Sequence, residues 1–201
     1  MAARKSIGVA VLGSLLAAAG CATAPKPPDT AGLPAFSLES YFPGRSEAWG
    51  VFQDRSGTLR RQFKVVIDST WDGQTLILDE RFAYTDGATE RRVWRIVKTG
   101  PNTYEGRADD VIGVARGIVQ GNQLSWTYSI RLPVGRNGLV TQFDDRMWLQ
   151  PDGVLINRAI VRKFGIRVAE ATITFQRKDA VAAGLARGAR KLIDRLFACG
   201  G

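Results

Sequence analysis

The sequence predicts an all-β domain, an antiparallel up-and-down β-barrel or a strongly curved sheet, followed by a C-terminal amphipathic helix. Between Trp49 and Arg177, segments of about eight to twelve residues alternate polar and apolar side chains, the period of half-buried strands. Gly, Asp and Asn separate these segments, in turns such as DRSG, WDGQ, TDGA and PDGV. We count about eight to ten strands linked mostly by hairpins, and closure into a barrel would protect the edge strands.

The chain begins with a predicted secretory signal peptide, residues 1–20. Arg4 and Lys5 give it a positive start, Ile7 to Leu16 are apolar, and small residues follow up to Gly20. The apolar run is shorter than the roughly 20 residues that cross a bilayer, so it does not predict a transmembrane helix.

Cys21 ends the sequence Ala18-Ala19-Gly20-Cys21, which has the form of a bacterial lipobox. We therefore expect the Cys21 sulfur to carry a diacylglycerol. Two or three acyl chains would hold the protein stably at a membrane. Plain secretion is the alternative. Ala22 stands where an aspartate would favour inner-membrane retention, so we expect a lipid-anchored protein of the bacterial cell envelope, at the outer membrane facing the periplasm.

Residues 21–35 are expected to form a disordered tether after the lipidated cysteine. They contain prolines at positions 25, 27, 28 and 34 and show no apolar periodicity. The β-barrel-like domain is expected to start near Phe36 and to span residues 36–178.

Two segments show the strand alternation most clearly. In RRQFKVVIDSTW one face carries Phe63, Val65, Ile67 and Trp71, and the other carries Lys64 and Asp68. In QLSWTYSIRL one face carries five large side chains: Leu124, Trp126, Tyr128, Ile130 and Leu132. Such strands are half-buried and antiparallel.

Several strand faces mix charged with large apolar residues. Glu80 alternates in register with Leu78 and Phe82, and Arg92 with Trp94. In LVTQFDDRMWLQ, Asp144, Arg146 and Trp148 share one face and Asp145 lies on the other, so either face carries an acid. If the mixed faces point into the barrel, their charges must be paired, since an unpaired buried charge costs several kcal/mol.

This polar layer has two interpretations: structural pairing, or orientation of a ligand's head group between apolar walls. Under the second interpretation the candidate ligand-binding residues are Trp94, Trp126, Tyr128, Trp148, Glu80, Arg92, Asp144 and Arg146.

Residues 179–201 change character and predict a basic amphipathic helix. Val181, Leu185, Leu192 and Leu196 lie on one arc of the helical wheel, opposite a basic arc. The helix could pack on the barrel or lie in a membrane interface. With Cys21 acylated, the other cysteine, at position 199, has no partner within the chain, so we expect no internal disulfide.

The net charge is +9, and removal of the signal peptide takes away only two basic residues. A basic balance suits an anionic membrane surface, or serves solubility alone. No recognition-helix pattern is present, and an exported protein does not meet nucleic acid, so we expect no nucleic-acid partner. The chain has no histidine, which excludes Ser-His-Asp and Cys-His catalysis and histidine-ligated zinc. We predict no cofactor and no metal site.

Five strings carry a family resemblance: YFPGRSEAWGVFQDRSGTLRRQFKVVIDSTWDG, LDERFAYTDGATERRVWRI, YEGRADDVIGVARG, FDDRMWLQPDGVLINRA and KFGIRVAEATITF. Over about residues 36–178 the sequence resembles the bacterial lipoprotein family catalogued as domain of unknown function 3833. The resemblance implies an exported, lipid-anchored protein with a lipocalin-like β fold and no established activity. The resemblance also implies that genes for fatty-acid modification lie near those of family members, which suggests a role that involves lipids.

Three classes of function remain open. The first is binding of a lipid, fatty acid or other apolar ligand inside the barrel, with the N-terminal lipid beside the membrane. The second is a structural or interaction role with a solid core. The third is catalysis, because DERF, RADDV and FDDR contain carboxylates. Adjacent strand residues point to opposite faces, so each pair supplies one carboxylate per face, and no catalytic set is predicted.

Overall fold

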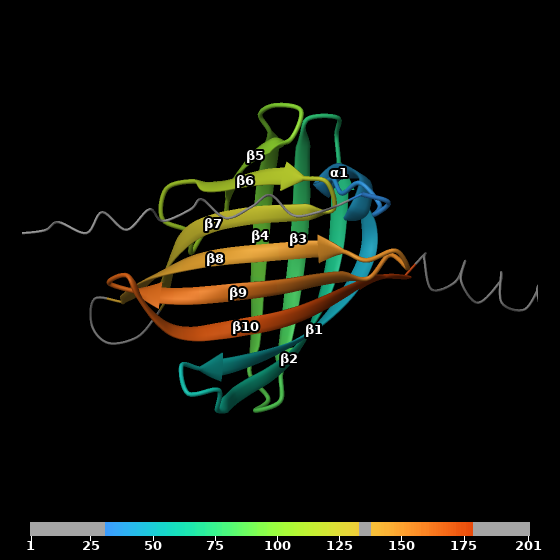
Figure 1. Cartoon of the computed structure of the whole chain (residues 1–201). Coiled ribbons are helices and arrows are strands. Elements are labelled where there is room, and N and C mark those ends of the chain that lie inside the picture. Colours follow the sequence, from blue (N-terminus) through green and yellow to red (C-terminus); the bar gives the residue numbers. More distant parts are fainter. Residues whose placement is uncertain (1–30, 133–137, 179–201) are drawn as a thin grey trace, which may run out of the picture.

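The protein is an antiparallel β-barrel in a computed structural model that describes residues 31–132 and 138–178 (Figure 1). A short helix, α1 (Leu38–Tyr41), precedes the strands. The ten strands of the described residues are β1 (Gly44–Asp54), β2 (Leu59–Trp71), β3 (Thr75–Tyr84), β4 (Thr89–Lys98), β5 (Thr103–Arg107), β6 (Ala115–Gln120), β7 (Gln123–Leu132), β8 (Leu139–Leu149), β9 (Leu155–Lys163) and β10 (Ile166–Arg177).

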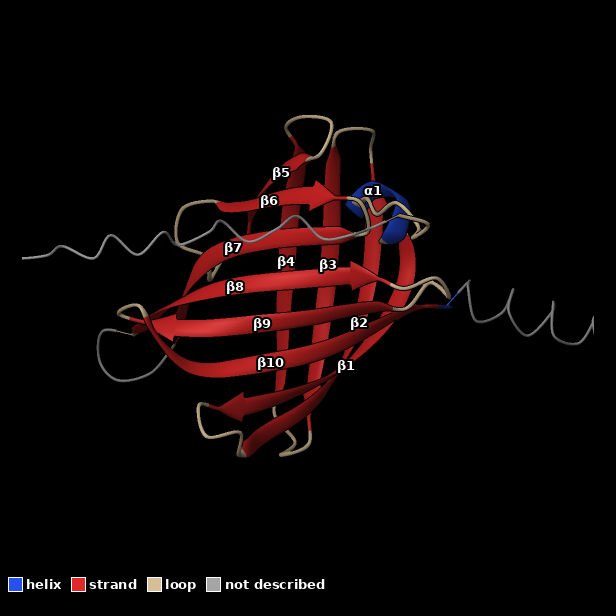
Figure 2. Cartoon of the chain, in the orientation of Figure 1, coloured by secondary structure: helices blue, strands red, loops and turns tan. Residues whose placement is uncertain are grey.

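Each strand pairs with its neighbour in sequence, and β1 pairs with β10, which closes the barrel (Figure 2). The all-β, up-and-down prediction is confirmed, and closure decides between a barrel and an open curved sheet. Closure also removes the unpaired sheet edges that would otherwise invite aggregation. The first strand starts at Gly44, five residues before the alternation becomes visible in the sequence.

Four predictions lie outside the described residues: the signal peptide, the Cys21 lipid site, the 179–201 helix and the isolation of Cys199. The described part of the tether is residues 31–35. Within the chain segments that the structure describes, no helix is long and apolar enough to cross a membrane.

The tight turn between β6 and β7 shows how the sequence sets the strand connections. Gly121 has a φ of 61°, which glycine adopts without the steric cost that a side chain would bring. Asn122 is buried, and its side-chain Nδ2 donates to the Leu149 carbonyl at 3.0 Å. The Gly121 carbonyl accepts from the Phe36 N–H at 2.9 Å, so the turn also holds the segment that enters α1.

Helix α1 closes one end of the barrel, a feature that the sequence analysis did not predict. Leu38 and Tyr41 are buried, and the Tyr41 hydroxyl donates to the Phe175 carbonyl at 3.1 Å. Glu39 accepts from the Lys98 ammonium at 2.6 Å and the Tyr104 hydroxyl at 2.7 Å. These bonds attach α1 to β4, β5 and β10 at one end of the interior.

The β8 strand corrects one expectation. Asp144, Arg146 and Trp148 do not face the interior, whereas Asp145 is 4% exposed and does. The reason is the apolar content of the opposite face, where Phe143 and Met147 flank Asp145 and pack inward. Burying Asp145 against Asn157 costs less free energy than exposing Phe143 and Met147 to water would.

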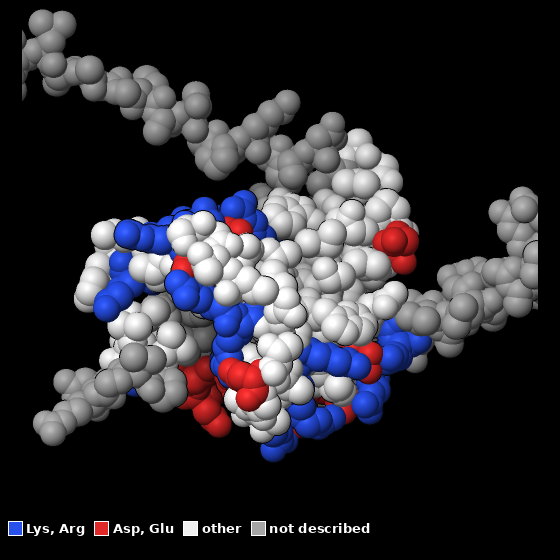
Figure 3. Space-filling view, turned by 90° about the horizontal axis from the view of Figure 1, so that it is seen from below, with Lys and Arg blue, Asp and Glu red and all other residues white. Residues whose placement is uncertain are grey.

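The outer surface carries many ion pairs between neighbouring strands. Asp79 accepts from Arg91 on β4 at 2.8 Å and from Arg81 on its own strand at 3.2 Å, and Glu170 accepts from Arg158 on β9 at 2.9 Å. Basic and acidic side chains are interspersed over the barrel face seen in Figure 3. Exposed pairs of this kind contribute about 0 to 1 kcal/mol each, so they favour solubility more than stability.

Candidate ligand-binding cavity

The barrel encloses a cavity of about 680 Å³. It extends from Leu38 and Phe42, at the α1 end, to Phe52, Arg61 and Thr89 near the hairpins of the opposite end. Its volume lies within the range of about 300 to 1,000 Å³ that is usual for small-molecule sites. The interior is therefore not packed solid.

Ten aromatic side chains line the cavity. Trp94 contacts Trp126 and Tyr128 edge to face, with ring centroids 5.8 and 5.3 Å apart, and Tyr128 stacks on Phe143 at 5.1 Å. A second aromatic group, Phe63, Phe82 and Tyr84, lines the part nearer the hairpins. These rings give the interior a rigid apolar surface.

Glycines in the strands explain why the large rings leave space. A Cβ added at Gly117 would lie 2.3 Å from the Trp126 ring, and one at Gly106 would lie 2.6 Å from it. Phe63 lies equally close over Gly50. The rings thus lie directly over backbone that carries no side chain, which leaves room for the cavity.

We expect Gly117→Ala to push Trp126 into the cavity. The substitution should lower the free energy of unfolding by about 1 to 3 kcal/mol, because the added methyl overpacks the wall. Chemical denaturation measures this loss, and a shift in tryptophan fluorescence reports the displaced ring. The matched control is Gly153→Ala, where a Cβ has open space but φ is 87°, so it carries backbone strain without an aromatic clash. An unchanged Trp126 environment in Gly117→Ala would contradict this role.

Arg92 is the centre of the polar cluster in the wall. Its Nη2 donates to Asp110 Oδ2 at 2.7 Å, its Nε lies 3.1 Å from the same oxygen, and Nη2 also reaches Glu90 Oε1 at 3.2 Å. Burial disfavours the charge on Arg92, but the nearby Glu80 and Asp110 carboxylates outweigh it and raise its pKa. The guanidinium stays charged inside the barrel.

Glu80 lies directly opposite Arg92 on the neighbouring strand β3. Burial raises the pKa of Glu80 to about 7, although the charge of Arg92 works in the opposite direction. The accessible part of this side chain faces the cavity rather than bulk solvent. Among the described residues, no basic group lies within 4 Å of the Glu80 carboxylate, so the expected Glu80–Arg92 contact is an electrostatic attraction without a hydrogen bond.

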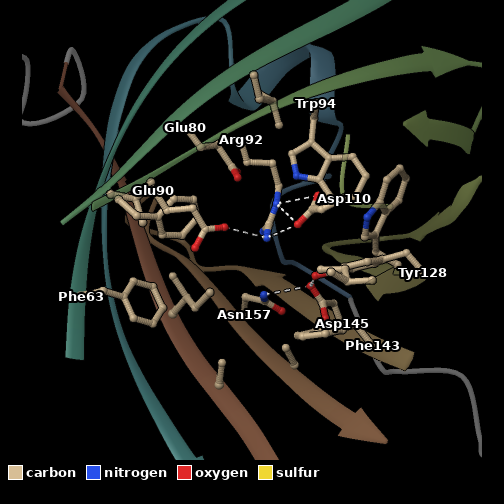
Figure 4. Close-up of a pocket in the computed structure, with 18 of the residues that line it drawn as sticks. Phe63, Glu80, Glu90, Arg92, Trp94, Asp110, Tyr128, Phe143, Asp145 and Asn157 are labelled. Atoms are coloured by element: carbon tan, nitrogen blue, oxygen red, sulfur yellow. Dashed lines mark hydrogen bonds and ion pairs between the residues drawn. The ribbon is translucent and has the colours of Figure 1, made fainter. Parts of the chain in front are cut away.

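Asp145 and Asn157 form a second polar group on the opposite wall (Figure 4). Asn157 Nδ2 donates to Asp145 Oδ2 at 3.3 Å, and the Tyr128 hydroxyl lies 3.5 Å from the same oxygen. Burial raises the pKa of Asp145 to about 7, although the hydrogen bond from Asn157 lowers it. The charge of Arg92 also acts on Asp145, so the two groups form one electrostatic cluster across the interior.

The structure brings five of the candidate ligand-binding residues to the cavity wall: Glu80, Arg92, Trp94, Trp126 and Tyr128. It places Asp144, Arg146 and Trp148 outside the cavity. Asp144 pairs with Arg146 at 2.7 Å, and Trp148 Nε1 donates to Gln123 at 3.0 Å. The paired polar layer therefore divides into an interior cluster and a separate surface pair.

Sequence reasoning missed Asp110, Asp145 and Asn157. Asp110 follows β5 in a loop, where no alternation indicates which way a side chain points. Asn157 had a visible signal, because it shares its parity with Leu155, Ala159 and Val161. A polar amide in the middle of an apolar face indicates a buried polar partner.

Comparison with known families gives one match over most of the chain. The model of a family described as protein of unknown function (DUF3833) matches residues 15–177. Among solved structures, the S-type phycobiliprotein lyase CPES from Guillardia theta is similar, with 10% identity, a TM-score of 0.48, and coverage of 70% of this chain and 90% of that one. No curated protein matches the sequence.

Proposed function

We propose that this chain, which belongs to the family described as protein of unknown function (DUF3833), is an envelope lipoprotein whose barrel binds a lipid or another apolar molecule. The observation that carries the proposal is the cavity of about 680 Å³ with aromatic walls and one polar cluster. Binding sites for apolar ligands combine such walls with a few placed polar groups. A scaffold has no need for this unfilled volume, since interiors are otherwise close-packed.

Ligand binding is tested by titrating the purified full chain with lipids while measuring its thermal midpoint and tryptophan fluorescence. A bound ligand stabilises the folded state in proportion to the logarithm of its concentration over its dissociation constant. We expect a rising midpoint and a fluorescence change, because Trp94 and Trp126 line the cavity. No change in either signal at saturating ligand would instead support the scaffold.

The membrane attachment is proposed to depend on Cys21. Its support is the sequence Ala18-Ala19-Gly20-Cys21 after an apolar run. We expect Cys21→Ser to abolish the acyl mass and to release the protein from the membrane fraction, because one thiol carries the whole anchor. Intact mass spectrometry and fractionation measure both results, with Cys199→Ser as the matched control. A Cys21→Ser protein that stays in the outer-membrane fraction would contradict this attachment.

A second candidate function, acid–base catalysis on an apolar substrate, is favoured by one observation. Glu80 and Asp145 both have a pKa raised to about 7 by burial, and groups near neutrality transfer protons efficiently. The same titrations distinguish the two candidates. A ligand recovered chemically unchanged after long incubation supports binding alone, and a converted ligand supports catalysis.

A further inference from the structure

The polar cluster of the cavity contains more acids than bases. Glu80, Glu90, Asp110 and Asp145 line the cavity together with Arg92. Two further basic residues, Arg61 and Arg131, also line the cavity, and Arg61 pairs with Asp86 at 2.8 Å outside this cluster. The electrostatic environment around Arg92 therefore favours positive rather than negative groups.

Arg92 is also already engaged by the protein. Its Nε and Nη2 donate to Asp110, and Nη2 donates to Glu90. An incoming carboxylate or phosphate could bind Arg92 through Nη1, which has no hydrogen bond within the described residues, but it would then lie beside the Asp110 and Glu90 carboxylates that the same guanidinium already holds. It would also lie near Glu80, whose like charge opposes a second anion.

The opposite wall contains two buried hydrogen-bond acceptors for which the described residues supply no donor. Within the part of the chain that the structure describes, Asp145 Oδ1 and Asn157 Oδ1 have no hydrogen-bond partner, and both atoms are almost fully covered, in residues that are 4% and 2% exposed. A buried polar atom without a partner costs about 1 to 3 kcal/mol. Both unpaired atoms are acceptors, so only a donor can satisfy them. A proton on Asp145 donated to Asn157 would do this without a ligand, and the test below separates that case.

We propose that the polar end of the ligand is a hydrogen-bond donor without negative charge, such as an amine or a hydroxyl, held between Glu80 and the Asp145–Asn157 pair. The apolar part of the molecule then occupies the aromatic cavity. This inference rests on the proposed binding function and narrows its ligand class. It disfavours free fatty acids, which the sequence alone left among the expected ligands.

Three amphiphiles with the same alkyl chain test the head-group preference: laurylamine, lauryl alcohol and laurate. Each is titrated into the full chain at pH 8 below its solubility limit or critical micelle concentration, with tryptophan fluorescence giving the dissociation constant. We expect laurylamine to bind at least about tenfold more tightly than laurate, the factor expected for one charge-assisted hydrogen bond. Laurate binding as tightly as the other two would overturn the inference and leave the binding function intact. No binding by any of the three would overturn both.

Single substitutions identify the residues that set the preference. Glu80→Gln removes one carboxylate of the cluster, and we expect it to reduce the ratio of laurate to laurylamine dissociation constants about tenfold. Glu105→Gln is the matched control, because Glu105 lies outside the cavity and pairs with Arg116 at 3.5 Å. An unchanged ratio in Glu80→Gln would overturn the assignment of this residue.

Asp145→Asn supplies a second, independent variant. A ligand that donates to Asp145 should lose affinity in this variant, and the loss should be greater for laurylamine than for laurate. If a proton on Asp145 satisfies Asn157 instead, the amide substitution leaves all three affinities unchanged, which would overturn the role of this pair in binding.

Discussion

Arg92→Ala should lower the free energy of unfolding by about 3 to 5 kcal/mol, because it leaves the carboxylates around it without their partner. Asp110 accepts two hydrogen bonds from Arg92, and Glu90 accepts a third. Glu80 also loses the charge that offsets its burial. The side chain of Arg92 is 17% exposed, so water cannot replace these interactions fully. Chemical denaturation at neutral pH measures the change.

Arg116→Ala is the matched control for this prediction. Arg116 pairs with Glu105, and the two side chains are 71% and 44% exposed, so its truncation should cost about 0 to 1 kcal/mol. Equal losses in both variants would show that Arg92 acts like a surface residue. That result would contradict the claim that the charged cluster around Arg92 stabilises the folded protein.

Wild-type stability should fall as the pH rises from about 5 to about 8. Burial raises the pKa of Glu80 from 4.5 to about 7 and that of Asp145 from 3.8 to about 7. At a pH between the unfolded-state pKa and the folded-state pKa of each carboxyl, the folded protein holds a proton that the unfolded chain has released. Raising the pH therefore favours unfolding. The chain has no histidine to contribute in this window. Most proteins instead gain stability on leaving acid, because their carboxylates have lowered pKa values.

Asp145→Asn isolates one half of this effect. Each pKa unit corresponds to about 1.36 kcal/mol, so Asp145 accounts for up to roughly 4 kcal/mol between low and high pH. The amide resembles the protonated carboxyl and does not ionise. We therefore expect the variant to be more stable than wild type at pH 8 and to show a shallower decline, as measured by denaturation across the pH range. A wild-type free energy of unfolding that stays constant or rises from pH 5 to 8 would contradict the raised pKa values of Glu80 and Asp145.

Alternation in the sequence was enough to predict the barrel and much of its interior. On β3 and β7 one face is clearly more apolar, so Phe82, Trp126 and Ile130 could be placed inward. On β8 both faces carry an aromatic and an acidic residue, and the face predicted to point inward, that of Asp144, Arg146 and Trp148, was the wrong one. Inward packing of Phe143 and Met147 decided the face, and this packing depends on neighbouring strands and not on the sequence of one strand.

The partners inside the candidate site could not be read from the sequence. Glu80 and Arg92 were paired because both were expected inside, and the register does place them side by side. The guanidinium nevertheless binds Asp110, which comes from a loop after β5. Likewise, the space that forms the cavity depends on Gly106 and Gly117 lying beneath Trp126, an arrangement that requires three strands to meet.

Native mass spectrometry of the full chain, extracted from its native compartment in a mild detergent that is removed in the gas phase, tests ligand binding most directly. We predict that wild-type protein carries a non-covalent apolar molecule, and that organic extraction recovers it as a species without negative charge. Ala159→Phe, which places a ring in the cavity wall, should lose most of this bound mass. Wild-type protein that shows only the mass of its own chain and any covalent lipid, with nothing recovered by extraction, would contradict ligand binding by the barrel.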